Sequence, residues 1–199
     1  EWVSLMTVLT KYESHVVDRY VDLHAFRRML DIGGNSGAFA AFACASAPTL
    51  EAVVLDLPDV VRTAQEVGAH EGARARLSFV AGDAFTDDLP RGCDLITFKG
   101  VLHDWPDEEA ATLVERAWAA LEPGGTLVIF ERSAQPTDGE HPKRFANLTM
   151  LIWGWIFSGP SRYERQLASL GADAVTVNLF DLDLPWMCIV AVKPAAPSR

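Results

Sequence analysis

His103 is the side chain in this sequence that is best suited to proton transfer. It lies in the segment Gly100-Val-Leu-His-Asp-Trp-Pro-Asp107, shortly after Lys99. The ordinary pKa of histidine, about 6.5, suits a general base at neutral pH. Glu131 is a carboxylate that could hold the imidazole in one tautomer, as the acid of a catalytic triad does. The alternative for Glu131 is a surface carboxylate that pairs with Arg132.

A glycine-rich turn and two carboxylates form a second group of residues that could act on a ligand. The turn is Asp31-Ile-Gly-Gly-Asn-Ser-Gly37, whose glycines allow a ligand to approach the backbone closely. Asp56 follows the next apolar run, where a carboxylate can accept hydrogen bonds from both hydroxyls of an adenosyl ribose. The alternative for Asp56 is to cap a helix that begins at Pro58. With Asp83 in the equivalent place after a third run, these residues together favour an adenosine-containing ligand.

Short apolar runs that alternate with helical patterns must position these residues. Five strands are predicted, at residues 28–32, 52–56, 77–81, 93–98 and 126–131. Helical patterns are expected over residues 1–27, 37–47 and 107–121, and in the segment that begins at Pro58. Strands that alternate with helices predict right-handed crossovers and a mainly parallel sheet. Ligands bind such sheets beyond the carboxyl ends of the strands, where the residues discussed above are expected to lie.

The last part of the chain has a different pattern. Two strands are expected at residues 174–180 and 185–192, and since no helix separates them they should be antiparallel. The predicted fold class is therefore α/β. It is a Rossmann-like, doubly wound, mainly parallel sheet of seven strands whose last strand is antiparallel, with helices on both faces. The apolar run from Leu148 to Phe157 is about half the ~20 residues that a membrane span needs, and it is predicted to be a buried helix.

Composition limits the classes of protein to which the chain can belong. Its 199 residues, 49% of them hydrophobic, suit one domain with a full core. A net charge of −10 argues against non-specific binding to nucleic acid or to an anionic membrane. The three cysteines lie far apart in apolar runs, and we expect small buried residues in a reducing compartment and no metal centre. Since no targeting segment is visible, a cytoplasmic protein is expected.

Five segments of the chain occur in an order and at spacings that are typical of one family. They are Leu30-Asp-Ile-Gly-Gly-Asn-Ser-Gly37, Leu55-Asp-Leu-Pro58, Ala81-Gly-Asp-Ala-Phe85, Phe98-Lys-Gly-Val-Leu-His-Asp-Trp-Pro-Asp-Glu108 and Leu121-Glu-Pro-Gly-Gly-Thr-Leu-Val-Ile-Phe-Glu131. The chain resembles, from about residue 28 onward, the class I S-adenosylmethionine-dependent O-methyltransferases of the plant caffeic-acid type and of bacterial polyketide and other natural-product pathways. The combination of Asp-Leu-Pro with Lys-x-x-x-His-Asp-Trp is the most specific part of this resemblance.

The resemblance implies that S-adenosylmethionine is the cofactor and a small aromatic compound the acceptor. The residues implied to line the cofactor site are Gly33, Asp56, Leu57, Asp83, Ala84 and Lys99. His103 would be the general base, with Glu131 as one of its two acidic supports, in methyl transfer to a hydroxyl that we expect to be phenolic. Met150 and Trp153 supply apolar surface for the acceptor, although a core helix explains each of them equally well.

The chain departs from the family's pattern at two positions. Ala84 stands where members usually carry a methionine beside the adenine, and the second acid of the family falls on Ser161, with Glu164 nearby but displaced. The resemblance also implies an N-terminal helical domain that joins two subunits. Residues 1–27 are therefore expected to be linker helices, residues 28–199 the catalytic domain, and the protein a homodimer through a domain missing from this chain.

Three rival functions compete with this prediction. A binding module that has kept the cofactor site but lost or changed its chemistry is favoured by Ser161 and disfavoured by His103. A nicotinamide-dependent dehydrogenase is disfavoured by Asn35 in the glycine turn and by the lack of a Tyr-x-x-x-Lys pair. A DNA methyltransferase is supported neither by the charge nor by an Asn-Pro-Pro-Tyr motif.

Overall fold

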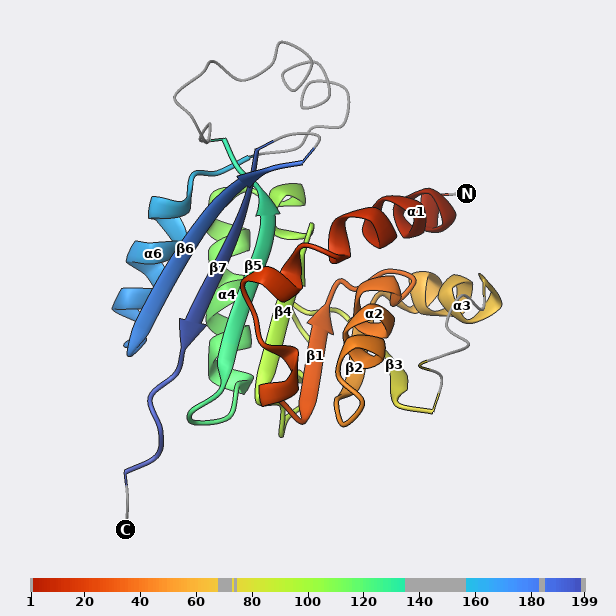
Figure 1. Cartoon of the computed structure of the whole chain (residues 1–199), viewed down its shortest axis with the longest axis horizontal. Coiled ribbons are helices and arrows are strands. Elements are labelled where there is room, and N and C mark those ends of the chain that lie inside the picture. The colour runs from red at the N-terminus through yellow and green to blue at the C-terminus, as the bar shows by residue number, and fades with distance from the viewer. Residues whose placement is uncertain (1, 68–72, 74, 135–156, 183–184, 198–199) are drawn as a thin grey trace.

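A seven-stranded sheet forms the centre of the protein, in the order β3-β2-β1-β4-β5-β7-β6 (Figure 1). The computed structural model describes residues 2–67, 73, 75–134, 157–182 and 185–197. Strands β1 to β5 run parallel to one another, whereas β7 runs antiparallel to both β5 and β6. The predicted fold class, with its antiparallel last strand, is confirmed.

All seven predicted strands are present. They are β1 (Arg28–Ile32), β2 (Glu51–Asp56), β3 (Leu77–Ala81), β4 (Leu95–Lys99), β5 (Thr126–Arg132), β6 (Ala174–Asp181) and β7 (Pro185–Val192). The largest displacement is at β4, which begins at Leu95 rather than at residue 93. The side chain of the preceding Asp94 turns back and accepts hydrogen bonds from the backbone N–H groups of Arg27 and Arg28. This contact ties the loop before β4 to the start of β1.

The helices follow the prediction except over residues 15–27, where short 3₁₀ turns replace the expected helix, and in the C-terminal part. They are α1 (Trp2–Ser14), α2 (Ala38–Ser46), α3 (Pro58–Val67), α4 (Asp107–Ala120) and α6 (Pro160–Ser169), with short 3₁₀ turns η1 (Val17–Arg19), η2 (Leu23–Ala25) and η3 (Leu102–Asp104). Helix α6 was not predicted, because beyond Pro160 it buries only Tyr163 and Leu167. The buried helix predicted between Leu148 and Phe157 lies, apart from Phe157, outside the described residues.

Successive side chains of each central strand pack on opposite faces of the sheet, as the strand period of two requires. One core layer contains Leu30, Ile96 and Leu127, packed beneath α4 and α6. The other contains Met29 and Val128, packed beneath α2 and the segment that follows α1. The predicted burial of the three cysteines is confirmed, because all are buried and unbonded to one another.

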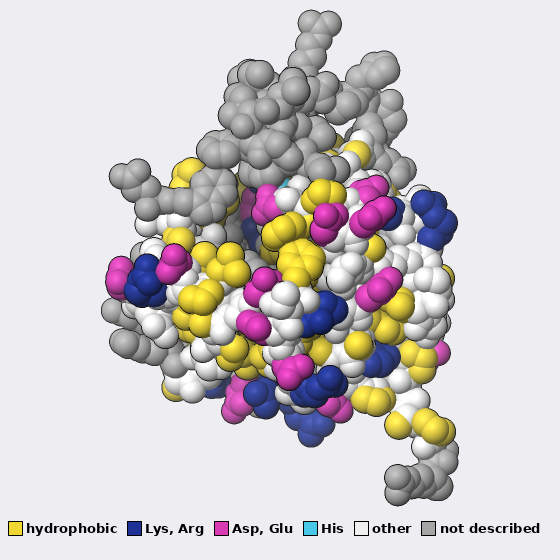
Figure 2. All heavy atoms as spheres, turned by 180° about the vertical axis from the view of Figure 1, so that it is seen from behind, with side chains coloured by type: hydrophobic (Ala, Val, Ile, Leu, Met, Phe, Trp, Pro, Cys, Tyr) yellow, Lys and Arg dark blue, Asp and Glu magenta, His cyan; other side chains and the backbone are white. Residues whose placement is uncertain are grey.

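The carboxyl ends of the parallel strands meet at one edge of the sheet, and α1 lies beside that edge (Figure 1). Helix α1 packs on α2 and α3. On the face in Figure 2, acidic side chains lie among the basic ones, and hydrophobic side chains gather in the middle. In the described part of the chain, no helix combines the length and the apolar character that a membrane crossing requires.

Candidate active site

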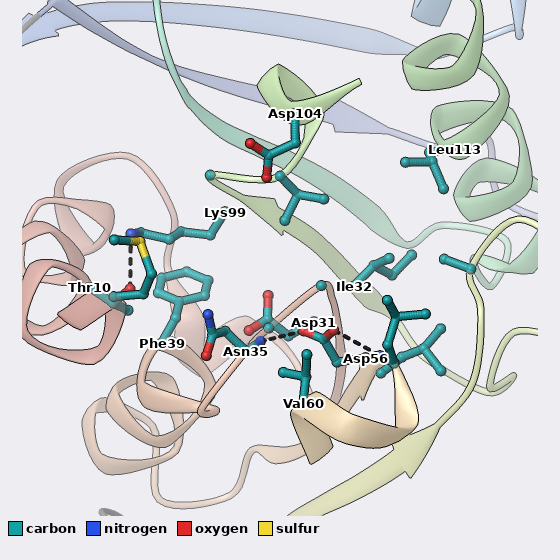
Figure 3. A pocket seen from close by; sticks show the side chains of 18 of the residues that line it. Thr10, Asp31, Ile32, Asn35, Phe39, Asp56, Val60, Lys99, Asp104 and Leu113 are labelled. Atoms are coloured by element: carbon teal, nitrogen blue, oxygen red, sulfur yellow. Dashed lines mark hydrogen bonds between the residues drawn. The ribbon is translucent and has the colours of Figure 1, made fainter. Parts of the chain in front are cut away.

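A cavity of about 370 Å³ opens at the carboxyl edge of the sheet (Figure 3). This volume falls within the range of small-molecule sites, about 300–1,000 Å³. The cavity is lined by His103 and by every residue predicted for the cofactor: Gly33, Asp56, Leu57, Asp83, Ala84 and Lys99. The structure thus brings the strand ends together as the sequence analysis expected, and it adds Met6, Leu9, Thr10 and Glu13 of α1 to the wall.

The glycine turn after β1 brings the backbone close to the cavity. Gly33 has a φ of +68°, and a Cβ atom there would lie 2.8 Å from Cγ2 of Val101. A Cβ atom on Gly34 would lie 2.5 Å from Oδ2 of Asp31. Packing therefore excludes a side chain at both positions, and both glycines line the cavity.

Asp56 is fixed across this turn. Its Oδ2 accepts a hydrogen bond from the backbone N–H of Asn35 and its Oδ1 accepts one from the N–H of Leu57, both at 2.8 Å. Burial raises the pKa of this carboxyl, and the two backbone bonds oppose that rise. Because both donors lie outside α3, the contacts do not match the alternative of a helix cap. Each oxygen keeps a lone pair with which to accept a further hydrogen bond from a ligand.

The loop after β3 is shaped by its own carboxylates and by an arginine of α4. Oδ1 of Asp83 accepts from the N–H of Phe85, and the N–H of Asp83 donates to Oδ2 of Asp87, both at 2.8 Å. Arg116 donates from Nε to the carbonyl of Ala84 at 2.7 Å and from its guanidinium to the carbonyl of Asp87. This role of Arg116 was not predicted, because in the sequence the residue cannot be distinguished from other charged residues on an exposed helix face.

Asp31 is a second residue that the sequence analysis missed. Its side chain is 1% exposed, and Oδ1 accepts a hydrogen bond from the hydroxyl of Thr97 at 2.7 Å. Its Oδ2 has no hydrogen-bond partner among the described residues. Burial raises the pKa of this carboxyl to about 7, against the opposing effects of Thr97 and Lys99. A buried acceptor of this kind, at the wall of a cavity, can receive a hydrogen bond from a ligand.

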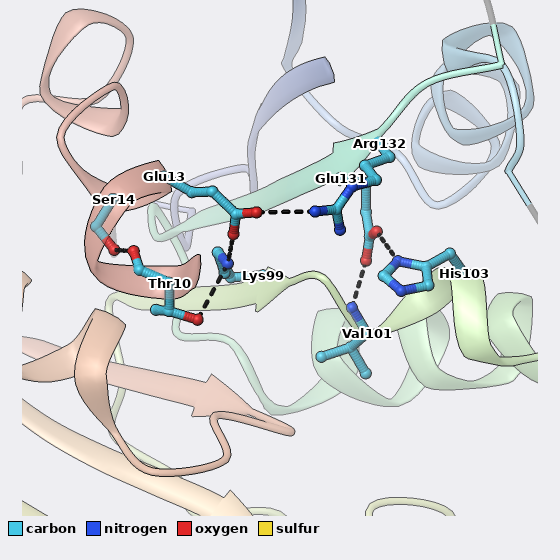
Figure 4. A network of polar contacts seen from close by, with 8 residues as sticks. All are labelled: Thr10, Glu13, Ser14, Lys99, Val101, His103, Glu131 and Arg132. Carbon is cyan, nitrogen blue, oxygen red and sulfur yellow. Dashed lines mark hydrogen bonds and ion pairs between the residues drawn. The ribbon is translucent and has the colours of Figure 1, made fainter. Parts of the chain in front are cut away.

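His103 and Glu131 form a buried pair on the other side of the cavity (Figure 4). Nδ1 of His103 lies 2.6 Å from Oε2 of Glu131, whose Oε1 accepts from the N–H groups of Val101 and Leu102 at 2.6 and 2.7 Å. Burial lowers the pKa of His103, but the Glu131 carboxylate more than offsets this, so the pKa is raised above its ordinary value. Glu131 is 1% exposed. The alternative of a surface carboxylate is therefore wrong.

The second acid of the family's pattern is not supplied from the expected place. Ser161 is exposed at the start of α6. The carboxylate of Asp104 lies near the imidazole, with its Oδ1 3.5 Å from Nε2 of His103. The ring of Phe157 packs edge-on against His103, with centroids 5.7 Å apart. Met150 and Trp153, the predicted acceptor residues, lie outside the described residues.

Lys99 lines the cavity, but its ammonium group is held by α1. It forms an ion pair with Oε2 of Glu13 and donates to the hydroxyl of Thr10 at 3.2 Å. Oε1 of Glu13 lies 2.9 Å from Nη2 of Arg132. The sequence analysis missed Thr10 and Glu13, because only the apolar stripe of this helix carried a signal. Within the described part of the chain, no group of three His, Cys, Asp or Glu side chains could hold a metal ion.

The chain belongs to the family of O-methyltransferase domains, which it matches over residues 3–174. Over 162 residues it is 38% identical to the acetylserotonin O-methyltransferase of Mus musculus, covering 77% of this chain and 40% of that protein. Over 182 residues it is 32% identical to the 3-hydroxy-5-methyl-1-naphthoate 3-O-methyltransferase of Streptomyces sahachiroi, covering 90% of this chain and 52% of that protein. The chain thus spans about half the length of these relatives.

A solved structure shows the same architecture. Human N-acetylserotonin methyltransferase, in complex with S-adenosylmethionine, superposes with a TM-score of 0.82 at 26% identity. The superposition covers 98% of this chain and 55% of the human chain. The seven-stranded sheet and its helices are therefore those of a class I methyltransferase, as the resemblance implied.

Proposed function

We propose that the protein transfers a methyl group from S-adenosylmethionine to a hydroxyl, specifically a phenolic one, of a small aromatic natural product. The observation that carries this proposal is the buried His103–Glu131 pair, placed at a cavity whose opposite wall is the glycine turn and Asp56. Membership of the O-methyltransferase domain family supports it. The name of the Streptomyces relative, with a hydroxynaphthoate as acceptor, supports the aromatic class.

The cavity has the properties that a nucleoside cofactor with a charged tail requires. Two residues of its wall, Asp31 and Asn35, each have a buried acceptor oxygen, Oδ2 and Oδ1, that bonds to no other described residue. Asp56 would accept from the ribose hydroxyls, and Leu57 and Ala84 would contact the adenine. When bound, S-adenosylmethionine supplies an activated methyl group. The smaller side chain of Ala84 leaves more room beside the adenine than the methionine that is usual in the family.

His103 would take the proton of the acceptor hydroxyl. Because Nδ1 faces the Glu131 carboxylate, the neutral ring carries its proton on Nδ1, and Nε2 is the basic nitrogen. A phenol has a pKa of about 10 and is almost entirely protonated at neutral pH. A positioned base that removes this proton typically contributes ~10²–10⁴ in rate. Glu131 would stabilise the imidazolium that forms.

The experiment that tests this function uses a labelled methyl donor. Wild-type protein is incubated with labelled S-adenosylmethionine and a panel of phenols, naphthols and hydroxyindoles, and transfer of label to the acceptor is measured. Calorimetry with S-adenosylhomocysteine tests the cofactor separately. Labelled products that carry an O-methyl group are expected. Tighter binding of NAD than of S-adenosylhomocysteine would contradict the cofactor assignment.

A second candidate is a protein of the same fold that binds the cofactor but has lost or changed its chemistry. The exposed Ser161, in place of the second acid, favours it. The two functions differ in one result. S-adenosylhomocysteine binds in both, but only the methyltransferase produces a labelled phenol ether that disappears in His103→Ala.

We further propose that a protein of the relatives' full length is a cytoplasmic homodimer, joined through a domain that precedes linker helices at residues 1–27. The support is an apolar face on α1, where Leu5, Val8 and Tyr12 are 51%, 67% and 62% exposed. Exposed apolar surface of this kind normally belongs to an interface. Sedimentation is expected to show a defined dimer of the longer protein, and the 199-residue chain is expected to bind S-adenosylhomocysteine but to methylate poorly. A fully active, monomeric chain would contradict this.

A further inference from the structure

A carboxylate from α1 lies between two cations at the cavity wall (Figure 4). Glu13 is 2% exposed, and its two oxygens pair with Nζ of Lys99 and with Nη2 of Arg132. The side chains of Lys99 and Arg132 are each 8% exposed. Two positive charges that have lost most of their water thus share the Glu13 carboxylate. Buried charges are costly unless they are paired, so Glu13 stabilises both cations.

The two cations reach Glu13 because of their places in the sheet. Lys99 ends β4 and Arg132 ends β5, and these neighbouring strands are in parallel register with Lys99 opposite Phe130. Lys99 and Arg132 therefore point to the same face of the sheet, where the ring of Trp186 lies 5.6 and 4.6 Å from them. Glu131 points to the opposite face, toward His103. The last two residues of β5 thus belong to two separate polar clusters.

Arg132 also acts on His103. The charged groups that act on the imidazole are Glu131 from β5, Asp104 from its own turn and, from the other face of the sheet, Arg132 at the end of β5. The two carboxylates raise the pKa of His103, and Arg132 lowers it. Because Glu13 is paired with Arg132, its negative charge offsets part of the positive charge that acts on the imidazole.

We propose that Glu13 is a positioning residue of the active site: it holds the ammonium group of Lys99 at the cofactor cavity and balances the charge of Arg132, which acts on His103 from the neighbouring cluster. Helix α1 is then a part of the site and not only a linker. The identity of the ligand in this inference rests on the proposed function. The contact of Thr10 with Lys99, one helical turn before Glu13, adds a second point at which α1 holds the lysine.

Glu13→Gln tests this proposal, because it keeps the shape of the side chain and removes its charge. Calorimetry should show affinity for S-adenosylhomocysteine reduced about tenfold or more, since a charged partner of Lys99 is lost. An NMR titration of the protein without ligand should show a lower pKa for the His103 imidazole. A purely structural role of Glu13 would not produce this second change. Unchanged affinity, or an unchanged titration of His103, overturns the proposal.

Ser14→Ala is the matched control, because Ser14 is buried in the same turn of α1 and its hydroxyl donates to the carbonyl of Thr10 rather than to either cation. It should alter neither the affinity nor the titration. If Glu13→Gln does not fold, Lys99→Met supplies a background in which one of the two cations paired with Glu13 is removed. Adding Glu13→Gln to Lys99→Met should leave the affinity for S-adenosylhomocysteine unchanged and should still lower the pKa of His103. A further large loss of affinity, or an unmoved titration, contradicts the proposal.

The proposed function and this inference fail differently. If the wild type does not bind S-adenosylhomocysteine, the cofactor assignment is wrong, and the titration of His103 still measures the effect of Glu13. If the wild type binds and the Glu13→Gln variant binds equally well, only the role of Glu13 is wrong.

Discussion

Two buried glutamates organise opposite sides of the cavity, and they do so by different means. On the base side, Glu131 contacts two backbone N–H groups and the imidazole of His103, which is 28 residues away in the chain. On the cofactor side, Glu13 contacts two full cations, 86 and 119 residues away. Glu131 thus acts on one titrating group, whereas Glu13 compensates charges that would otherwise be costly to bury.

The comparison shows how one strand end can serve two sites. Alternation along β5 sends Glu131 to the face covered by α4 and Arg132 to the face reached by α1. The base side is then expected to control turnover, and the cofactor side to control affinity. A substitution that changes only turnover or only affinity supports this division of roles. A substitution that changes both contradicts it.

His103→Ala should have the largest effect. It removes the proposed base and should lower turnover by ~10²–10⁴-fold, while affinity for S-adenosylhomocysteine stays near that of the wild type. Single-turnover kinetics with labelled donor and calorimetry measure the two quantities. His24→Ala, at an exposed histidine, is the control and should leave both unchanged. Wild-type turnover in His103→Ala would show that this residue is not the base.

Glu131→Gln should shift the pH dependence of turnover, with a smaller loss than His103→Ala. In the wild type, turnover needs neutral His103 and should rise with pH through its raised pKa. Without the carboxylate that raises this pKa, the acidic limb should move to lower pH. Protonated His103, paired with Glu131, also contributes to the free energy of unfolding. This contribution is complete below the pKa of histidine in the unfolded chain, about 6.5, and is lost as pH rises through the raised pKa of the folded protein. An unmoved limb would assign the titration to another group.

Asp31→Asn should change the pH dependence of stability. The folded carboxyl has a pKa of about 7, against an ordinary value of 3.8, and between these pH values it binds more protons than the unfolded one. The free energy of unfolding of the wild type should therefore fall as pH rises through this window, by up to about 4 kcal/mol. Urea denaturation should show no such fall in Asp31→Asn. The exposed Asp59→Asn is the control, and a fall of equal size in Asp31→Asn would contradict the assignment.

Asp56→Ala should have the smallest of these effects, confined to affinity. It removes charge-assisted hydrogen bonds to the ribose, at a cost of roughly 1.5–3 kcal/mol in binding free energy. Calorimetry with S-adenosylhomocysteine measures the loss, and Asp59→Ala is its control. The titration of His103 should not move. Unchanged affinity would remove Asp56 from the cofactor site, and a shifted pKa of His103 would show that Asp56, like Glu13, acts on the imidazole.

The residues that could be predicted from the sequence are those whose role follows from local pattern. Alternating apolar runs predicted all seven strands, and parallel strands place their carboxyl ends at one edge. Asp56 and Lys99 end such strands, and Asp83 and His103 follow them closely, so their convergence on one cavity was predictable. Glu131, near the end of another strand, contacts His103 there. Gly33 was predictable as well, because a tight turn after β1 needs a residue without a side chain.

Some residues have roles that depend on partners distant in the chain, and these roles could not be predicted from the sequence. Asp31 cannot be distinguished in the sequence from any other polar strand residue. In the fold its side chain is buried, and one of its oxygens has no hydrogen-bond partner within the described ranges. Arg116 and Glu13 look like surface charges of helices, because neither helical periodicity nor composition specifies which loop or cation the helix will pack against. Local sequence determines the direction in which a side chain points from its own element. The packing of elements far apart in the chain determines what that side chain meets there.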